Sequence, residues 1–234
     1  MFHFKKFSIN DEGVAMKVGT DSVLLGAWTK YHNPLRILDV GTGSGILALM
    51  MAQRYSNIAI DAVEIEAQAV KTAKVNFENS AWSQRLHAIH SDIQHFSETS
   101  VNRYSLIISN PPFFSQSLKT PHAARNLARH NDTLSIHDFL KCASHLLLPN
   151  GIVSVIFPFD TLPIWIAEAK RFSLFPCEVM YLKSSPTHFP HRAMVAFTNK
   201  SVVEMIENEL IIYALHRTYS DDYKELTRDF YLKF

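Results

Sequence analysis

The stretch from Tyr104 to Phe114 constrains the fold most, because a short apolar run, YSLIIS, stops at the sequence NPPFF. A run of this length and composition predicts a buried strand. Proline has no backbone N–H for a sheet ladder, so the strand ends before Pro111. The residue before a proline is held extended, which places Asn110 at the carboxyl end of the strand. Open α/β sheets bind ligands at that edge, and an amide beside an aromatic ring suits a planar group that carries an NH2.

A glycine-rich turn lies nearer the N-terminus. The apolar segment 36–40 is followed by Gly41-Thr42-Gly43-Ser44-Gly45 and then by an apolar helix over 46–54. Such a turn between strand and helix lets a ligand approach the backbone closely. The dinucleotide pattern G-x-G-x-x-G fails here because position 46 is Ile. Asp39 would repel a pyrophosphate but could accept a hydrogen bond from an ammonium group. The turn therefore favours a cofactor without phosphates and argues against a nicotinamide oxidoreductase.

Two further acidic residues follow predicted strands. Glu64 ends the strand predicted over 58–63, about 20 residues after the glycine turn, where dinucleotide folds place their ribose-binding acid. We therefore assign Glu64 to ligand binding and Glu66 to the cap of the helix that follows. Asp92 comes after the strand predicted over 86–90. It either accepts a hydrogen bond from an adenine amino group or caps the next turn.

The remaining apolar runs continue an alternation of strands and helices. Further strands are predicted over 104–109, 152–157, 177–182 and 192–198, and further helices over 22–28, 66–79, 135–147, 162–172 and 223–234. Thr20 or Asp21 is the expected N-cap of the first helix, and Ser135 caps a later one. Segment 209–214 is either a strand or a helix. This alternation predicts a parallel, doubly wound α/β sheet.

Composition narrows the class of protein. The chain has 234 residues, of which 47% are hydrophobic and 19% charged, as in a globular protein of one large domain. No signal-length or membrane-spanning apolar run is present, and Cys142 and Cys177 lack metal-ligand spacing. The histidines His188 and His191 also have no acid or cysteine at a ligand spacing. We therefore expect a cytoplasmic protein without a membrane segment, a metal or an obligate protein partner.

Any basic surface must be local, because the formal net charge is only +1 with neutral histidines. One basic cluster lies in 115–132, a segment long enough either to be functional or to be a solvated loop. The other lies in 183–192. Both clusters are candidate phosphate sites, and the residues assigned to RNA binding are Lys119, Arg125, Arg129, His191 and Arg192.

The two motifs at the strand ends resemble those of class I S-adenosylmethionine-dependent methyltransferases. DVGTGSG, from Asp39 to Gly45, is similar to their motif I, and Asn110-Pro111-Pro112-Phe113 is similar to the N/D-P-P-Y/F/W motif of amino-group methyltransferases. The resemblance implies a Rossmann-like sheet of seven strands, the last one antiparallel. It also implies a single methyltransferase domain over 1–234, with an N-terminal lid (1–34), a cofactor and catalytic core (35–200) and a C-terminal extension (201–234).

A resemblance to the bacterial tRNA1(Val) (adenine-37-N6)-methyltransferase family covers nearly the whole chain. It is carried by FKKF at 4–7, MKVGTDSVLLGAW at 16–28, ARH at 128–130 and DFYLK at 229–233. This implies methylation of the exocyclic N6 of adenosine 37, beside the anticodon, with S-adenosyl-L-methionine as methyl donor and tRNA as partner. Phe113 stands where many relatives carry Tyr.

The resemblance also implies residue roles. The catalytic set is Asn110, Pro111, Pro112 and Phe113, and the cofactor set is Lys17, Thr20, Asp39, Gly41, Gly43, Gly45, Glu64, Asp92 and Asn110. From composition alone, Lys17 is either a lid residue or a solvated lysine.

Several rival functions share these motifs. An adenine of ribosomal RNA or DNA, or a protein glutamine amide methylated at N5, also offers a planar NH2. Glutamine methyltransferases usually carry an additional N-terminal helical domain, whereas the first motif here begins near residue 36. A nonenzymatic RNA-binding module that retains an inactive cofactor fold is the alternative from another class.

Overall fold

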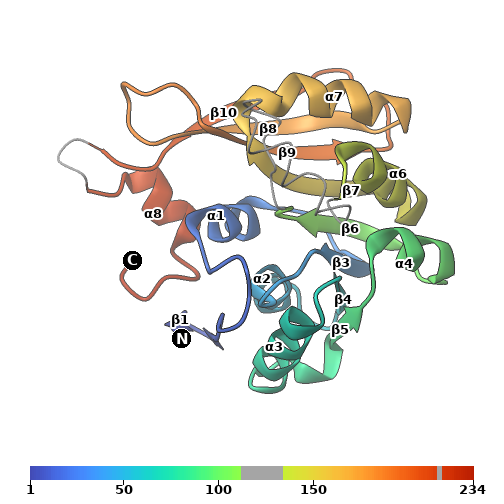
Figure 1. Cartoon of the computed structure of the whole chain (residues 1–234). Helices are drawn as coiled ribbons and strands as arrows, with labels where there is room; N and C mark the ends of the chain where they lie inside the picture. The colour runs from blue at the N-terminus through green and yellow to red at the C-terminus, as the bar shows by residue number, and fades with distance from the viewer. Residues whose placement is uncertain (112–133, 215–217) are drawn as a thin grey trace, which may run out of the picture.

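The computed structural model describes residues 1–111, 134–214 and 218–234. In this part of the chain, the central sheet has eight strands in the order β10-β8-β9-β7-β6-β3-β4-β5. The strands are β3 (Arg36–Val40), β4 (Ala59–Glu64), β5 (Leu86–His90), β6 (Tyr104–Ser109), β7 (Leu147–Pro158), β8 (Phe175–Lys183), β9 (Arg192–Thr198) and β10 (Ile206–Ile211). Helices cover both faces of this sheet (Figure 1).

The direction of the strands agrees with the predicted topology. Strands β7, β6, β3, β4 and β5 are parallel to one another. Strand β9 runs antiparallel to both β7 and β8, so the predicted antiparallel seventh strand is confirmed.

The predicted number of strands was wrong by one. Strand β10 adds a parallel edge beside β8 and overlaps the segment 209–214, which the sequence left open as strand or helix. It is an edge strand in which four residues are exposed and Leu210 is buried, so its sequence lacks the long apolar run of the inner strands. Strand β7 also begins earlier than predicted, because the chain is already extended at Leu147.

The helices follow most of the predicted bounds. They are α1 (Thr20–Trp28), α2 (Ile46–Arg54), α3 (Ala67–Glu78), α4 (Ile93–Thr99), α6 (Ile136–Leu146), α7 (Leu162–Arg171) and α8 (Asp221–Thr227). Two 3-10 turns, η1 (Ser83–Arg85) and η2 (Phe159–Thr161), complete the helical elements of the described residues. Ser135 caps α6 as predicted, because its side chain accepts a hydrogen bond from the Asp138 backbone N–H. The predicted helix over 223–234 was too long, since α8 ends at Thr227.

The N-cap of α1 differs from the prediction. Gly19 holds this position, and Thr20 and Asp21 already lie inside the helix. Asp21 instead pairs with Arg192, as described below, so its carboxylate is engaged by a distant cation and not by the first turn of its own helix.

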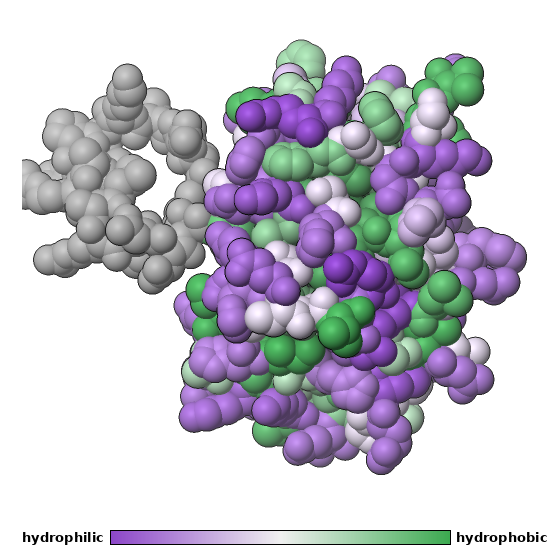
Figure 2. Space-filling model, turned by 90° about the vertical axis from the view of Figure 1, so that its right-hand side faces the viewer, coloured by the Kyte–Doolittle hydropathy of each residue, from purple (hydrophilic) through white to green (hydrophobic). Residues whose placement is uncertain are grey.

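Alternation along the strands builds a core on each face of the sheet. On β6, Leu106 and Ile108 belong to one core and Ile107 to the other. Helices α1, α2, α3 and α8 contribute to the first core, and α4, α6 and α7 to the second. The surface on the side of α4, α6 and α7 is mostly hydrophilic, with hydrophobic residues dispersed among the polar ones (Figure 2).

The two terminal segments pack together. Strands β1 (Phe2–His3) and β2 (Ser8–Ile9) pair as a small antiparallel hairpin. Phe4 is buried between Phe7 and Tyr231, with ring centroids 4.6 and 5.9 Å away. Lys5 Nζ donates to the backbone oxygen of Phe234 at 2.7 Å. The N-terminal segment is therefore held beside the C-terminal one (Figure 1).

Among the described residues, no helix combines the length and apolar character needed to cross a membrane. The same residues contain no group of three or more His, Cys, Asp or Glu that could hold a metal ion.

Candidate active site

The predicted site residues of the core gather at one edge of the sheet. Strands β6, β3, β4 and β5 are adjacent and parallel. Asp39 lies near the carboxyl end of β3 and Glu64 ends β4, while Asp92 and Asn110 follow β5 and β6. The sequence-based expectation that these four side chains share a ligand-binding edge agrees with the sheet topology.

The glycine turn adopts left-handed backbone conformations that are unfavourable for residues with a side chain. Gly41, Gly43 and Gly45 all have φ between 55° and 89°. A Cβ on Gly45 would overlap the ring of Phe77 on α3, so this glycine allows close packing of the turn. Among the described residues, a Cβ on Gly41 would meet no heavy atom within 4 Å, and one on Gly43 would meet only Val14, at 3.5 Å. The turn is therefore packed at Gly45 and open at the other two glycines, where a ligand can approach the backbone.

Glu64 fixes the shape of this turn. Its Oε2 accepts a hydrogen bond from Gly43 N at 3.0 Å, and its Oε1 accepts from Glu66 N at 2.9 Å. An ionised carboxylate has about four acceptor positions, so Glu64 retains capacity for further donors. Glu66 occupies the N-cap position of α3, but its side chain makes no capping hydrogen bond. Glu66 is therefore the N-cap residue by position, as predicted, but it lacks the side-chain hydrogen bond of a cap, and its own backbone N–H donates to Glu64.

Asp39 is fully buried below the turn. Its Oδ2 accepts hydrogen bonds from Thr42 Oγ1 at 2.5 Å and from Ala48 N at 3.1 Å. Its Oδ1 is buried and has no hydrogen-bond partner among the described residues. Burial raises the pKa of Asp39 to about 7, although both hydrogen bonds act in the opposite direction. A buried acceptor without a donor is costly in a protein on its own, which makes Asp39 a candidate for binding a cationic or N–H group.

Asp92 adopts one of the two roles left open. Its Oδ1 accepts from His95 N at 2.7 Å, so the carboxylate caps α4. The cap occupies one oxygen and leaves Oδ2 for another donor. A contact with an adenine amino group stays a prediction.

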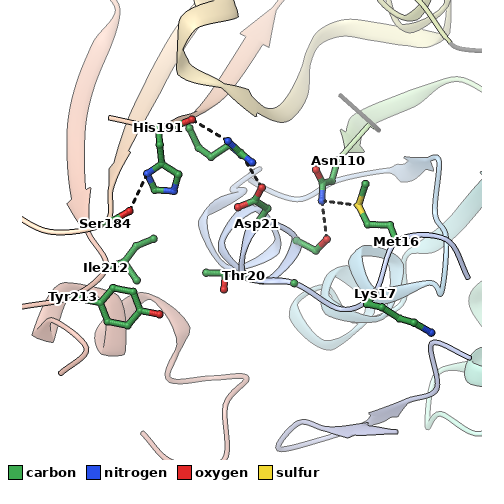
Figure 3. Close-up of a pocket in the computed structure, with 12 residues that line it drawn as sticks. Met16, Lys17, Thr20, Asp21, Asn110, Ser184, His191, Ile212 and Tyr213 are labelled. Atoms are coloured by element: carbon green, nitrogen blue, oxygen red, sulfur yellow. Dashed lines mark hydrogen bonds and ion pairs between the residues drawn. The ribbon is translucent and has the colours of Figure 1, made fainter. Parts of the chain in front are cut away.

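Asn110 lies in a pocket of about 560 Å³. The pocket is lined on one side by the segment that leads into α1 and on the other by residues that follow β8 and β10 or begin β9 (Figure 3). Its lining residues are Met16, Lys17, Gly19, Thr20, Asp21, Ser22, Asn110, Ser184, His191, Arg192, Ile212 and Tyr213. The N-terminal segment thus meets the end of β6, as expected for a lid.

The amide of Asn110 has a defined orientation. Its Nδ2 donates to Ser22 Oγ at 2.9 Å and points at Met16 Sδ at 3.7 Å (Figure 3). A thioether sulfur only accepts hydrogen bonds, so the nitrogen belongs on this side. No described residue donates to Asn110 Oδ1. The side chain, which is only 8% exposed, therefore offers a free acceptor oxygen from a fixed position.

Comparison with known proteins identifies the family. The Methyltransferase small domain family matches residues 15–157. A tRNA1(Val) (adenine(37)-N6)-methyltransferase of Flavobacterium psychrophilum is 43% identical over 235 residues, covering 100% of both chains. Proteins of the same name from Bacteroides fragilis and Haemophilus influenzae are 43% and 39% identical, covering at least 98% of each chain. The chain belongs to the tRNA1(Val) (adenine(37)-N6)-methyltransferase family.

Solved structures agree on the fold of this family member. A predicted O-methyltransferase from Agrobacterium tumefaciens is 18% identical, covers 90% of this chain and 96% of its own, and has a TM-score of 0.73. A putative class I S-adenosylmethionine-dependent methyltransferase from Listeria monocytogenes is 15% identical over 80% of this chain and 62% of its own, with a TM-score of 0.54. The predicted class, a methyltransferase with a class I fold, is confirmed.

Some of the residues assigned to catalysis or to RNA binding lie in the part of the chain that the structure does not describe. Pro112, Phe113, Lys119, Arg125 and Arg129 lie outside the described residues. His191 and Arg192 line the pocket beside Asn110. Arg192 Nε is 2.9 Å from Asp21 Oδ2, so this cation is already paired with α1. Burial, followed by the charge of Arg192, lowers the pKa of His191, which keeps this imidazole neutral at pH 7.

The two lid residues predicted from the resemblance differ in their contacts. Lys17 lines the pocket, but its Nζ donates to the Asp11 backbone oxygen at 2.6 Å and its side chain is 62% exposed. Thr20 lines the pocket from the first turn of α1. Both line the pocket beside Asn110, and their contact with a cofactor stays a prediction.

Sequence reasoning missed three residues that line the same pocket as Asn110. Ser22 is a buried polar residue at the start of an otherwise apolar helix, and that contrast is a signal that could have marked it. Met16 reaches Asn110 across 94 positions of sequence. Tyr213 lies in the C-terminal extension, where nothing in the local pattern indicates a site.

Proposed function

We propose that this protein transfers the methyl group of S-adenosyl-L-methionine to N6 of adenosine 37 in tRNA1(Val). The name of its relatives supplies the substrate. The observation that carries the chemistry is the unoccupied acceptor Asn110 Oδ1, held at the pocket by Ser22 and Met16. This reaction places the protein in the cytoplasm with its tRNA substrate.

The residues below the pocket fit the proposed cofactor. The open faces of Gly41 and Gly43 accept a closely packed ligand, and the unpartnered Asp39 Oδ1 suits its ammonium group. We assign the ribose hydroxyls to Glu64 and the adenine amino group to Asp92. Gly45, Asn110, Lys17 and Thr20 complete the proposed cofactor-binding set. When bound, the cofactor supplies an electrophilic methyl group on a sulfonium.

Asn110 and Pro111 activate the target amine in this proposal. Adenine N6 is a weak nucleophile because its lone pair is delocalised into the ring. Asn110 Oδ1 and the Pro111 carbonyl each accept one N6 hydrogen, which favours a tetrahedral nitrogen with its lone pair directed at the methyl group. The two oxygens also stabilise the positive charge that develops on N6. Positioning supplies most of the remaining acceleration. N6 would take up the methyl carbon as the bond of that carbon to sulfur breaks and a neutral thioether leaves, and the N6 cation would then lose one proton to water. Because this proton is acidic only after the transfer, no general base is required for the attack.

The target base leaves the stack of the anticodon loop to reach Asn110. We assign stacking on the extruded base to Phe113, with Pro112 fixing the backbone between them, and phosphate contacts to Lys119, Arg125, Arg129, His191 and Arg192. The Asp21 carboxylate balances Arg192 in the structure, so a phosphate at this place competes with that ion pair. The three-part division into lid (1–34), core (35–200) and extension (201–234) belongs to the same proposal.

Methyl transfer to defined RNAs tests this function. The protein is incubated with methyl-labelled cofactor and a tRNA1(Val) transcript, and the modified nucleoside is mapped by mass spectrometry. A transcript with guanosine at position 37 is the matched control. We expect N6-methyladenosine at position 37 only. Ribosomal RNA, an adenine-containing DNA duplex and a glutamine peptide are assayed in parallel, and preferential transfer to any of them would contradict the proposal.

A further inference from the structure

A column of stacked tyrosines ends at the pocket that contains Asn110. Tyr219 lies between Tyr213 and Tyr223, with ring centroids 5.1 and 4.6 Å away and interplanar angles of 25° and 8°. Tyr223 is 1% exposed and belongs to the first core, where α8 packs against α1 and β10, whereas Tyr213 and Tyr219 are each 37% exposed. The column thus runs from the protein interior to an exposed ring that lines the pocket.

The backbone holds this outer ring in place. Tyr213 N donates to Ser184 O at 3.0 Å, and Ile212 N donates to Lys183 O at 2.8 Å. Tyr213 also forms a β-bridge with Tyr219. The Tyr213 backbone is thus held by hydrogen bonds, and its ring is stacked on Tyr219. A side chain that is already ordered loses little conformational freedom when it binds a ligand.

The pocket extends from Tyr213 to Asn110. Figure 3 shows Tyr213 and Ile212 on one side of the first turn of α1 and Asn110 on the other. A volume of 560 Å³ falls within the range of about 300–1,000 Å³ that takes drug-sized ligands. The space is therefore sufficient for more than one planar base. Polar groups of Ser184 and His191 lie beside the tyrosine end.

We propose that the Tyr213 ring stacks on the nucleotide that flanks the target adenosine in a single-stranded RNA loop. This inference rests on the proposed function, because it takes the Asn110 end of the pocket as the place of the target base. Extrusion of one base leaves its neighbour without a stacking partner, and an aromatic side chain replaces that partner. The flanking base is then held regardless of its identity, since every base has a π-face.

Binding of an anticodon stem-loop RNA to variants of Tyr213 tests the platform. Tyr213→Ala is expected to weaken RNA binding by about 5- to 150-fold, while Tyr213→Phe retains the wild-type affinity because the ring is kept. Tyr31→Ala, at the far end of α1, is the matched control and is expected to bind normally. The dependence of affinity on salt keeps its slope in Tyr213→Ala, because no cation is removed.

A fluorescent base reports the stacking directly. 2-Aminopurine is placed at position 36 in one RNA and at position 38 in another. Quenching on binding wild-type protein, lost in Tyr213→Ala, is expected at one of the two positions. Thermal unfolding shows whether Tyr213→Ala and Tyr213→Leu are folded. Tyr213→Leu, which keeps the side-chain volume but lacks a ring, is expected to be folded and to lose the quenching as well.

The outcomes separate this inference from the proposed function. Unchanged RNA affinity in folded Tyr213→Ala and Tyr213→Leu, or no quenching at either position, would overturn the platform even if adenosine 37 is methylated. Methylation elsewhere, together with weakened RNA binding in Tyr213→Ala, would overturn the proposed target and leave Tyr213 as an RNA contact.

Discussion

The side-chain nitrogen of Asn110 lies 2.9 Å from the hydroxyl oxygen of Ser22, which joins the end of β6 to the first turn of α1. Helix α1 is tied in turn to β9 through the Asp21–Arg192 ion pair. The position of the Asn110 amide therefore depends on the segment 16–22, which lines the pocket. An amide free to rotate would present its nitrogen, a donor, to the substrate amine for part of the time.

Removal of the Ser22 hydroxyl is expected to slow methyl transfer. In Ser22→Ala, the Asn110 amide retains only the weak contact with Met16, and the acceptor oxygen is no longer fixed toward the pocket. A lost hydrogen bond of about 1 kcal/mol predicts a fall in kcat of roughly 5- to 10-fold. Single-turnover transfer at saturating cofactor measures it, and the cofactor Kd is expected to stay near the wild-type value.

Ser105→Ala is the matched control for this variant. Ser105 is also buried, and its hydroxyl accepts from Leu35 N at 2.8 Å at the opposite end of β6. Its loss is expected to lower the free energy of unfolding without changing kcat. Equal kcat in Ser22→Ala and the wild type would show that Ser22 does not orient the amide.

The buried carboxylate of Asp39 predicts a pH dependence of stability. Because burial raises its pKa from 3.8 to about 7, the folded state holds this proton more tightly than the unfolded state between those values. The contribution of Asp39 to the free energy of unfolding therefore falls as pH rises from about 4 to 7, by up to about 4 kcal/mol. Denaturation of the cofactor-free wild type and Asp39→Asn across this range is the test, and a pH-independent difference between them would contradict it.

Cofactor binding is expected to release the same proton. A cationic amino group beside Asp39 Oδ1 favours the ionised carboxylate and lowers its pKa. Near pH 6, binding should then release a fraction of a proton per site. Calorimetric titrations in two buffers of different ionisation enthalpy measure this release. Asp39→Asn should bind the cofactor more weakly and without proton release, whereas equal release in both proteins would place the titrating group elsewhere.

Replacement of Glu64 by glutamine is expected to weaken cofactor binding. The Glu64 carboxylate accepts from two backbone donors, Gly43 N and Glu66 N, whereas an amide has one acceptor oxygen. One donor then loses its partner and the glycine turn loses its support, which predicts about a 10-fold rise in the cofactor Kd. Glu66→Gln is the matched control, because the exposed Glu66 side chain makes no capping contact. A normal Kd in Glu64→Gln would exclude this role.

Local sequence patterns predicted the elements and strand ends that build the site. The apolar run of β6 and the two prolines after it place Asn110 without any knowledge of the fold, and the glycine turn does the same for Asp39. Both depend on interactions within a few residues. The edge strand β10 was not predicted as a strand, because four of its six residues are exposed and Leu210 is its one buried residue. Its sequence therefore lacks the alternation of apolar and polar residues that marks a half-buried strand.

Contacts between distant segments could not be predicted in this way. Ser22 and Asn110 are 88 positions apart, and Asp21 and Arg192 are 171 apart. Arg192 was assigned to RNA from its charge, but a charge does not reveal its partner. The position of Tyr213 at the pocket could not be predicted either, because it follows from the pairing of the C-terminal segment with the end of β8.

The role of Asn110 as acceptor for the target amine is tested most directly by Asn110→Ala. Single-turnover methyl transfer to the tRNA1(Val) transcript at saturating cofactor is compared with the cofactor Kd from calorimetry. Transfer is expected to fall by at least 100-fold, in the range found when a stabilising hydrogen bond at a reacting centre is removed. The cofactor Kd is expected to change by only about a few-fold, because most of the proposed cofactor contacts, those of Asp39, Glu64 and the glycine turn, are retained. Transfer at the wild-type rate in Asn110→Ala would contradict the proposed mechanism.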